Sequence, residues 1–300
     1  MKRLNTPVLF LIFNRLDTTK QVFEEIRKAK PKKLFIAADG PRNKEEKKKT
    51  HEVRKYVLDN IDWECEVKTL FRKNNLGCKL AVGGAITWFF KNIEMGIILE
   101  DDCLPSQSFF PFCEGLLKKY KNNNEIFSIS GRNHLGIWDN TGSSYFYTNG
   151  SIWGWATWRR AWKYNDLKLK NFYNPVVQKK FEYFSENAPV KAKEIYLGCK
   201  SVIDEKLSSW AYPWAFTRII NNSYNIIPSK NLIKNIGFSA DATHTFLMAG
   251  NEPDAYNINF PLKHNNNFEI DYKYINKVTQ KNKKNLINRL ISNIFRWLFK

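Results

Sequence analysis

Three acidic residues in succession end an apolar run in the first third of the chain. Glu100, Asp101 and Asp102 directly follow the apolar residues 96–99. Carboxylates at the mouth of a buried strand are unfavourable unless a positive charge neutralises them. A divalent cation held between these oxygens and a diphosphate would do so, and Mn²⁺ and Mg²⁺ both favour oxygen ligands. Solvated loop acids, or a cap for a helix from Phe109 onward, explain the same tripeptide without a metal.

Two earlier apolar runs also end close to a charged residue that could bind part of a nucleotide. Residues 8–13 are followed closely by Arg15, and residues 34–38 directly by Asp39. The forked donors of an arginine suit a diphosphate, and the aspartate can accept a hydrogen bond from the imide N–H of uracil. Simpler roles stay open, because Arg15 can pair with Asp17 and Asp39 can cap its own turn.

The first 130 residues alternate between apolar runs and amphipathic segments. The pattern predicts strands at 8–13, 34–38, 65–70 and 96–99, and helices at 17–30, through 53–61 and at 77–90. This order implies an α/β fold with a doubly wound, mostly parallel sheet and flanking helices. In such a sheet the site lies at the carboxyl ends of the strands, so Arg15, Asp39 and the three acids should face one crevice.

The pattern changes after residue 130. Residues 133–173 are aromatic-rich and predict irregular structure, 172–206 predict helix, 210–227 predict a helix followed by a strand, and 251–277 predict surface loops. We see no internal repeat and no flexible linker. The sequence therefore predicts one unit with a donor-binding half at 1–130, an acceptor-binding half at 131–277 and a basic amphipathic helix at 278–300.

The ordered set of these features resembles the nucleotide-diphosphosugar transferase superfamily, which has the GT-A fold. The resemblance is closest to the branch that includes N-acetylglucosaminyltransferase I and its bacterial relatives. The matching residues are Asn14-Arg15, Ala38-Asp39-Gly40, Asn75-Leu76-Gly77-Cys78-Lys79, Glu100-Asp101-Asp102, Gly154-Trp155-Ala156-Thr157-Trp158, Asn235-Ile236-Gly237-Phe238 and Ala242-Thr243-His244-Thr245. Together they span roughly residues 7 to 245, and their order is more specific than any one of them.

The resemblance implies a metal-dependent, inverting glycosyltransferase that uses a UDP-sugar, with N-acetylglucosamine as a guess by likeness. It implies that Asp102 is the direct ligand of Mn²⁺ or Mg²⁺, and that Arg15, Asp39, Lys79, Glu100 and Asp101 bind the nucleotide sugar. In several such enzymes a late histidine reaches back to the metal or diphosphate, a role that His244 would fill. A histidine hydrogen-bonded within its loop is the competing interpretation.

Tryptophans are candidates for the acceptor platform, because aromatic faces stack on the C–H faces of sugar rings. Within residues 152–158 we select Trp155 as the one that contacts sugar, and further along the chain Trp210 and Trp214. Tryptophan at this density is also typical of a core.

The general base is the least defined part of the predicted site, because Ala211 stands where many relatives carry an aspartate. The nearest carboxylates are Asp204 and Glu205, which we take as the catalytic candidates. Solvated helix acids beside Lys206 explain them equally well.

The composition adds three expectations. A net charge of +19 would attract phosphate-rich partners, although the chain is rich in lysine throughout, and no nucleic-acid recognition motif appears. The five cysteines, without a CxxC pair, indicate reduced thiols in a cytoplasmic protein. No segment approaches the ~20 apolar residues that span a bilayer.

The last 20 residues place apolar side chains at three- and four-residue steps, with Lys and Arg between them. This pattern favours a helix lying on an anionic membrane, at the cytoplasmic face of the inner membrane where a lipid-linked saccharide acceptor would be extended. A helix packed on the domain or on a second subunit is the alternative. For the whole chain, the competing functions are a non-catalytic nucleotide- or saccharide-binding relative, a nucleotidyltransferase, and a nucleic-acid-binding protein.

Overall fold

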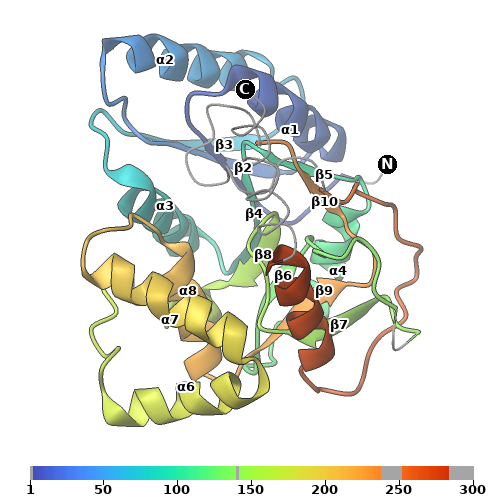
Figure 1. Ribbon diagram of the computed structural model, residues 1–300. Helices are drawn as coiled ribbons and strands as arrows, with labels where there is room; N and C mark the ends of the chain where they lie inside the picture. Colours follow the sequence, from blue (N-terminus) through green and yellow to red (C-terminus); the bar gives the residue numbers. More distant parts are fainter. Residues whose placement is uncertain (1–2, 140–141, 238–251, 284–300) are drawn as a thin grey trace, which may run out of the picture.

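An eight-stranded sheet forms the centre of the computed structural model, which describes residues 3–139, 142–237 and 252–283 (Figure 1). Its strand order is β3-β2-β1-β4-β8-β6-β9-β7. The strands are β1 (Val8–Ile12), β2 (Lys33–Ala38), β3 (Glu66–Phe71), β4 (Met95–Glu100), β6 (Ile126–Ser130), β7 (Tyr145–Thr148), β8 (Trp155–Trp158) and β9 (Tyr224–Pro228). All run in one direction except β7 and β8, so the sheet is mostly parallel.

Helices cover both faces of this sheet. They are α1 (Leu16–Ala29), α2 (Lys44–Asp59), α3 (Gly77–Asn92), α4 (Phe109–Lys119), α5 (Arg159–Trp162), α6 (Pro175–Asn187), α7 (Pro189–Ile203) and α8 (Ala211–Ile220). Side chains of α1, α2 and α4 pack with one face of β1, and those of α3, α5 and α8 pack with the other. Both faces of β1 are therefore buried, which explains its continuous apolar sequence.

The connections of the first half create a switch point in the sheet. From β1 the chain winds to β2 and β3 on one side, and then returns through α3 to β4 on the other side of β1. Ligands of open α/β sheets bind at such a point, outside the carboxyl ends of the strands. The predicted α/β, doubly wound and mostly parallel architecture is confirmed, and each predicted strand and helix of this half lies within a few residues of its expected bounds.

The prediction of irregular structure at 133–173 is confirmed only in part, because the strands β7 and β8 and the short helix α5 also lie there. All four residues of each strand are buried, so neither strand shows the polar and apolar alternation by which a half-exposed strand is recognised. Strand β6 and the short antiparallel pair of β5 (Cys103–Pro105) and β10 (Ile233–Asn235) were also not expected. The helix-then-strand prediction for 210–227 is confirmed by α8 and β9.

A helix at 272–283 closes the described part of the chain, and its first residues fall where loops were expected. Tyr274 and Ile275 are buried against the cluster that also contains α6 and α7. The remainder of the helix predicted at 278–300 lies outside the described residues. Within the described ranges, no helix has the length and apolarity needed to cross a bilayer. All five cysteines are free thiols.

Candidate functional site

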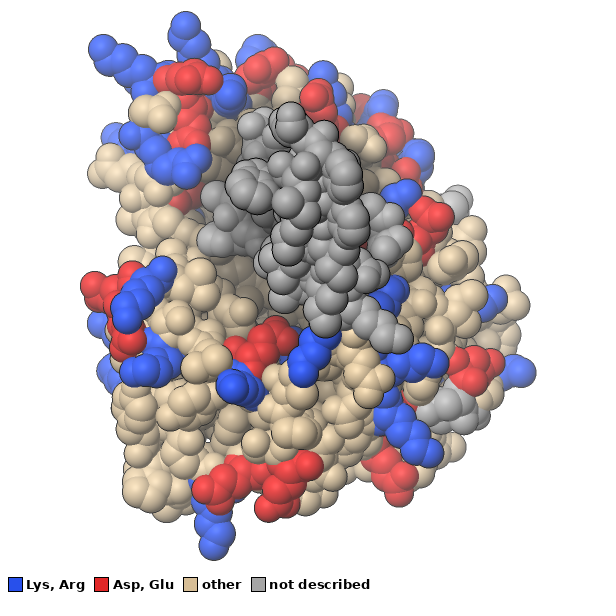
Figure 2. Space-filling model, viewed as in Figure 1, with Lys and Arg blue, Asp and Glu red and all other residues tan. Residues whose placement is uncertain are grey.

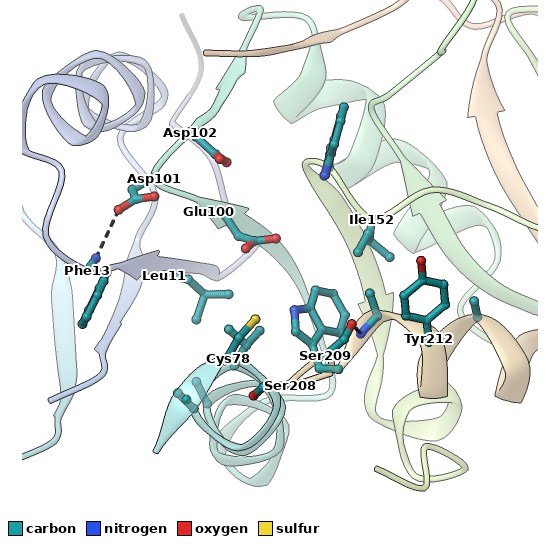
Figure 3. Close-up of a pocket in the computed structure, with 18 of the residues that line it drawn as sticks. Leu11, Phe13, Cys78, Glu100, Asp101, Asp102, Ile152, Ser208, Ser209 and Tyr212 are labelled. Atoms are coloured by element: carbon teal, nitrogen blue, oxygen red, sulfur yellow. Dashed lines mark hydrogen bonds between the residues drawn. The ribbon is translucent and has the colours of Figure 1, made fainter. Parts of the chain in front are cut away.

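The ends of β1 and β4 meet at the switch point and bring the predicted donor residues together. The two strands are parallel neighbours, with Leu11 in register with Glu100. The backbone N–H of Phe13 donates to Oδ2 of Asp101 at 3.1 Å, which ties the two strand ends to each other (Figure 3). Nη1 of Arg15 lies 3.8 Å from Oδ2 of Asp102.

A cavity of about 760 Å³ opens at this point. Figure 3 shows Glu100 pointing into it from the strand end that also carries Asp101 and Asp102, with Ser208, Ser209 and Tyr212 on the opposite wall. The predicted site residues that line the cavity are Arg15, Asp39, Glu100, Asp101, Asp102 and Trp210. The sheet therefore gathers residues from three separate strand ends around one space large enough for a small ligand.

The three adjacent carboxylates destabilise one another in their ionised form. Burial raises the pKa of Glu100, Asp101 and Asp102, and the negative charge of Asp102 raises the pKa of both other acids further. Arg15 and the N–H of Phe13 act in the opposite direction on Asp101 but do not cancel the effect. A second positive charge at this place would relieve the repulsion.

The donor set at the strand end suits Mg²⁺ or Mn²⁺ held together with a diphosphate. Among the residues that the structure describes, no group of three or more His, Cys, Asp and Glu side chains encloses a metal position. These ions, however, often take only one or two carboxylates and complete their coordination with substrate phosphates and water. Asp102 and its neighbours fit that mode, since the strand end is acidic and opens into the cavity. His244, the second predicted ligand, lies outside the described residues.

The backbone of Gly237 packs directly against the side chain of Asp102. A Cβ atom on Gly237 would lie 2.3 Å from Oδ2 of Asp102 and 3.0 Å from Nη1 of Arg15. The backbone N–H of Gly237 donates to Oδ1 of Asn235 at 2.8 Å, which fixes its position. Only a residue without a side chain can approach the carboxylate so closely.

Asp39 has a structural role that accounts for most of its hydrogen-bonding capacity. Its carboxylate accepts hydrogen bonds from the backbone N–H groups of Gly40 at 2.9 Å, and of Leu76 and Gly77 at 3.0 Å each. These bonds cap the beginning of α3 and hold the loop before it against the end of β2. The simpler interpretation, a cap on its own turn, is confirmed by the bond from Gly40, and the cap on α3 was not expected. Asp39 also lines the cavity, so its predicted contact with a nucleotide stays a prediction.

Lys79 is not among the residues that line the cavity. It lies in the first turn of α3, and its backbone N–H donates to Oγ of Ser208 at 3.2 Å. This bond joins α3 to the loop that precedes α8, so the Lys79 position holds two walls of the cavity together.

The prediction that Trp155 contacts an acceptor sugar is wrong. Its side chain is fully buried in β8 and stacks on Trp210 at a centroid separation of 5.8 Å, within a cluster that includes Trp162 and Trp214. Trp214 is also fully buried and does not line the cavity, whereas Trp210 does. The core interpretation applies to these two rings, because a buried ring has no face free for a ligand. Trp153, two residues before Trp155, is half-buried and lines the cavity.

The prediction of Asp204 and Glu205 as the general base is also wrong. Both are exposed residues after the end of α7 and neither lines the cavity. Asp204 caps α7 and lies 3.5 Å from Nζ of Lys206, as the solvated-acid interpretation holds. The carboxylate that does line the cavity from α7 is Glu194, which sequence reasoning missed because it resembles any other acid in a charged helix.

The charge of the described surface is mixed. Figure 2 shows Lys and Arg side chains interspersed with Asp and Glu over this face. Five positively charged residues line the cavity: Arg15, Arg42, Arg72, Lys191 and Arg218. Phosphate binding is therefore better supported at the cavity than over this face as a whole.

Comparison with protein-family models and with curated protein sequences finds no match. Among solved structures, the chain is similar to a mannosyltransferase from Pyrobaculum calidifontis in complex with GDP-Man and Mn²⁺, with 8% identity, a TM-score of 0.40, and coverage of 74% of this chain and 70% of that one. A 4-diphosphocytidyl-2C-methyl-D-erythritol synthase from Anaerococcus prevotii matches with 8% identity, a TM-score of 0.37 and coverage of 74% and 88%. A UDP-glucose pyrophosphorylase in complex with UDP-glucose matches with 12% identity, a TM-score of 0.37 and coverage of 77% and 93%. At this level of similarity no activity carries over to this chain.

Proposed function

We propose that the protein is a metal-dependent glycosyltransferase of the GT-A type, which moves a sugar from a UDP-sugar to a saccharide acceptor. The observation that carries the proposal is the convergence of Arg15, Asp39 and the Glu100–Asp102 acids on one cavity at the switch point of the sheet. A phosphate-binding arginine beside a cluster of carboxylates that needs a cation matches what a nucleoside diphosphate and its metal require.

The donor would lie along the carboxyl ends of β2, β1 and β4. Arg15 would bind the diphosphate, and the loop held by Asp39 would form the wall beside the uracil. Asp102, with Glu100 and Asp101 next to it, would hold Mn²⁺ or Mg²⁺. When bound, the metal would offset the negative charge that develops on the departing UDP.

The acceptor would enter the half of the cavity lined by α7, α8 and Trp153. Glu194 is the carboxylate available there among the described lining residues, and its Oε1 lies 2.7 Å from Nζ of Lys191. In an inverting transfer, the acceptor oxygen attacks the anomeric carbon, its proton passes to the carboxylate of Glu194, and the bond to UDP breaks with the electron pair leaving on the phosphate oxygen.

Two finer parts of the proposal rest on the resemblance stated from the sequence: N-acetylglucosamine as the donor sugar and bacterial surface glycan as the product. A third part, residues 278–300 as a peripheral contact with the cytoplasmic face of the membrane, rests on the sequence pattern of that segment. Its apolar side chains recur at three- and four-residue steps, with Lys and Arg between them.

Calorimetric titration of UDP with and without Mn²⁺ tests the donor site. We expect binding that depends on Mn²⁺ in the wild type and that Asp102→Ala removes. Asp204→Ala is the matched control, because it deletes an acid of the same kind that does not line the cavity. Absence of UDP binding in both conditions would refute the proposal.

A non-catalytic nucleotide- or saccharide-binding protein is the second candidate, and one observation favours it. Ala211 lines the cavity at the position where relatives often carry the catalytic aspartate. The two candidates differ in turnover: an enzyme releases UDP from its UDP-sugar over time in the presence of Mn²⁺, whereas a binding protein retains the sugar nucleotide unchanged.

A further inference from the structure

A buried arginine, Arg218, lines the cavity, and the proposed donor site does not use it. Arg218 lies in the last turn of α8 and is 3% exposed. Its Nε donates to the backbone oxygen of Trp214 at 3.4 Å, and Nη1 is buried without a hydrogen-bond partner among the described residues. A guanidinium that is buried and only partly hydrogen-bonded is unusual, because each unpaired donor retains its desolvation cost.

The surrounding structure holds the Arg218 guanidinium in one place. It lies 5.7 Å from the centroid of the Trp214 ring. On another side the backbone of Gly150 approaches so closely that a Cβ there would lie 2.0 Å from Nη1 of Arg218. Gly150 has φ +83°, a conformation that favours glycine, and it also lines the cavity.

The charge of Arg218 has no counter-charge in the described protein. Burial lowers the pKa of Arg218, and no described acid acts in the opposite direction. Arg132 provides the contrast: it is 2% exposed, but it forms an ion pair with Glu252. An unpaired buried charge is strongly destabilising, so such a group is expected where a ligand supplies the opposite charge.

We infer that Arg218 forms a subsite for an acidic group, a carboxylate or a phosphate, carried by the acceptor. The inference rests on the proposed function and names the substrate class of its acceptor half. Two features assign the group to the acceptor rather than the donor. Arg218 comes from α8 and contacts the segment after β7, whereas the donor residues follow β1, β2 and β4. Asn149 and Ser151, the two neighbours of Gly150 in the sequence, also line the cavity. Their side chains are polar and uncharged, which suits a sugar.

The wild-type protein tests this inference before any substitution is made. Methyl β-glucuronide, methyl β-glucoside 6-phosphate and methyl β-glucoside share one ring and differ in their acidic group. Their binding is measured by saturation-transfer NMR in the presence of UDP and Mn²⁺. We expect one of the acidic probes to bind on the order of tenfold more tightly than the neutral one, because a hydrogen bond between two charged groups contributes more than one between neutral groups. Which acidic probe binds identifies the group, and equal binding of all three would overturn the inference.

The variant Arg218→Met tests whether this residue is responsible. We expect it to lose the preference for the acidic probe while UDP binding stays at the wild-type value, so the donor site and the acceptor subsite are assessed separately. We also expect an equal or higher melting temperature, because an unpaired buried charge is removed. Arg218→Lys keeps the charge and should retain part of the preference. Lys163→Met is the control for net charge, since Lys163 is exposed and does not line the cavity.

Two results would contradict the assignment. An unchanged preference for the acidic probe in Arg218→Met would show that the acidic group binds elsewhere. Tighter binding of UDP-glucuronate than of UDP-glucose in the wild type, with the difference lost in Arg218→Met, would place the acidic group on the donor instead.

Discussion

Replacing Gly237 by alanine should disable the donor site through a single added methyl group. The new Cβ would lie 2.3 Å from Oδ2 and 2.8 Å from Cβ of Asp102. Ordinary contacts begin near 3.4 Å, so the Asp102 carboxylate or the backbone at Gly237 has to move by about 1 Å. Nη1 of Arg15 would lie 3.0 Å from the new Cβ, so the arginine also has to move by a few tenths of an ångström.

The size of the effect follows from the role of Asp102. Gly237 is a positioning residue, and changes that misplace a metal ligand typically lower metal affinity by about 10–100-fold. The overpacked contact should also reduce the free energy of unfolding by about 1–3 kcal/mol. We therefore expect a folded protein whose UDP binding has lost most of its dependence on Mn²⁺.

Calorimetric titration of UDP at several Mn²⁺ concentrations measures the first effect, and urea denaturation measures the second. Gly115→Ala is the matched control: no atom lies within 4 Å of a Cβ at Gly115, which is inside α4, so this variant should be slightly more stable and bind UDP normally. Wild-type Mn²⁺ dependence in Gly237→Ala would refute both the placement of Asp102 and its assignment as the metal ligand.

Three further variants separate function from stability. Glu194→Gln should slow UDP release from UDP-N-acetylglucosamine by about 10²–10⁴-fold, the range for loss of a general base, while UDP affinity is retained; an unchanged rate would exclude Glu194. Trp155→Ala should lower the free energy of unfolding in urea by about 3–5 kcal/mol, as expected for a core aromatic, and a variant of wild-type stability would contradict the burial described here. Asp39→Ala should lower the free energy of unfolding by about 0.5–2 kcal/mol through loss of the cap on α3, and stability equal to the wild type would show that the cap contributes nothing.

The proposed donor half of the site was accessible from the sequence because local pattern and topology determine it. Apolar runs at 8–13, 34–38 and 96–99 predict buried strands, and the carboxyl ends of parallel strands lie at one edge of a sheet. Polar residues at those ends, such as Arg15 and Asp102, must therefore approach one another. The structure confirms that both line one cavity.

The proposed acceptor half was not accessible in the same way. Trp153 and Trp155 are alike in type and stand two positions apart, yet one lines the cavity and the other is fully buried. Asp204 and Glu194 are both acids of one helical region, and only Glu194 lines the cavity. Composition and spacing do not distinguish the members of either pair, because exposure to the cavity depends on how α7, α8 and the segment after β7 pack together.

The sequence by itself therefore determined the α/β class, the order of the first strands and the acidic strand end. The tertiary structure decided which tryptophans belong to the core, that Asp39 caps α3, and that Arg218 is buried without a counter-charge. The physical reason is the range of the interactions. Strand patterns and strand ends arise from residues that are neighbours in the sequence. The burial of Arg218 instead depends on the backbone of Gly150, which stands 68 positions earlier in the chain and packs against this residue of α8.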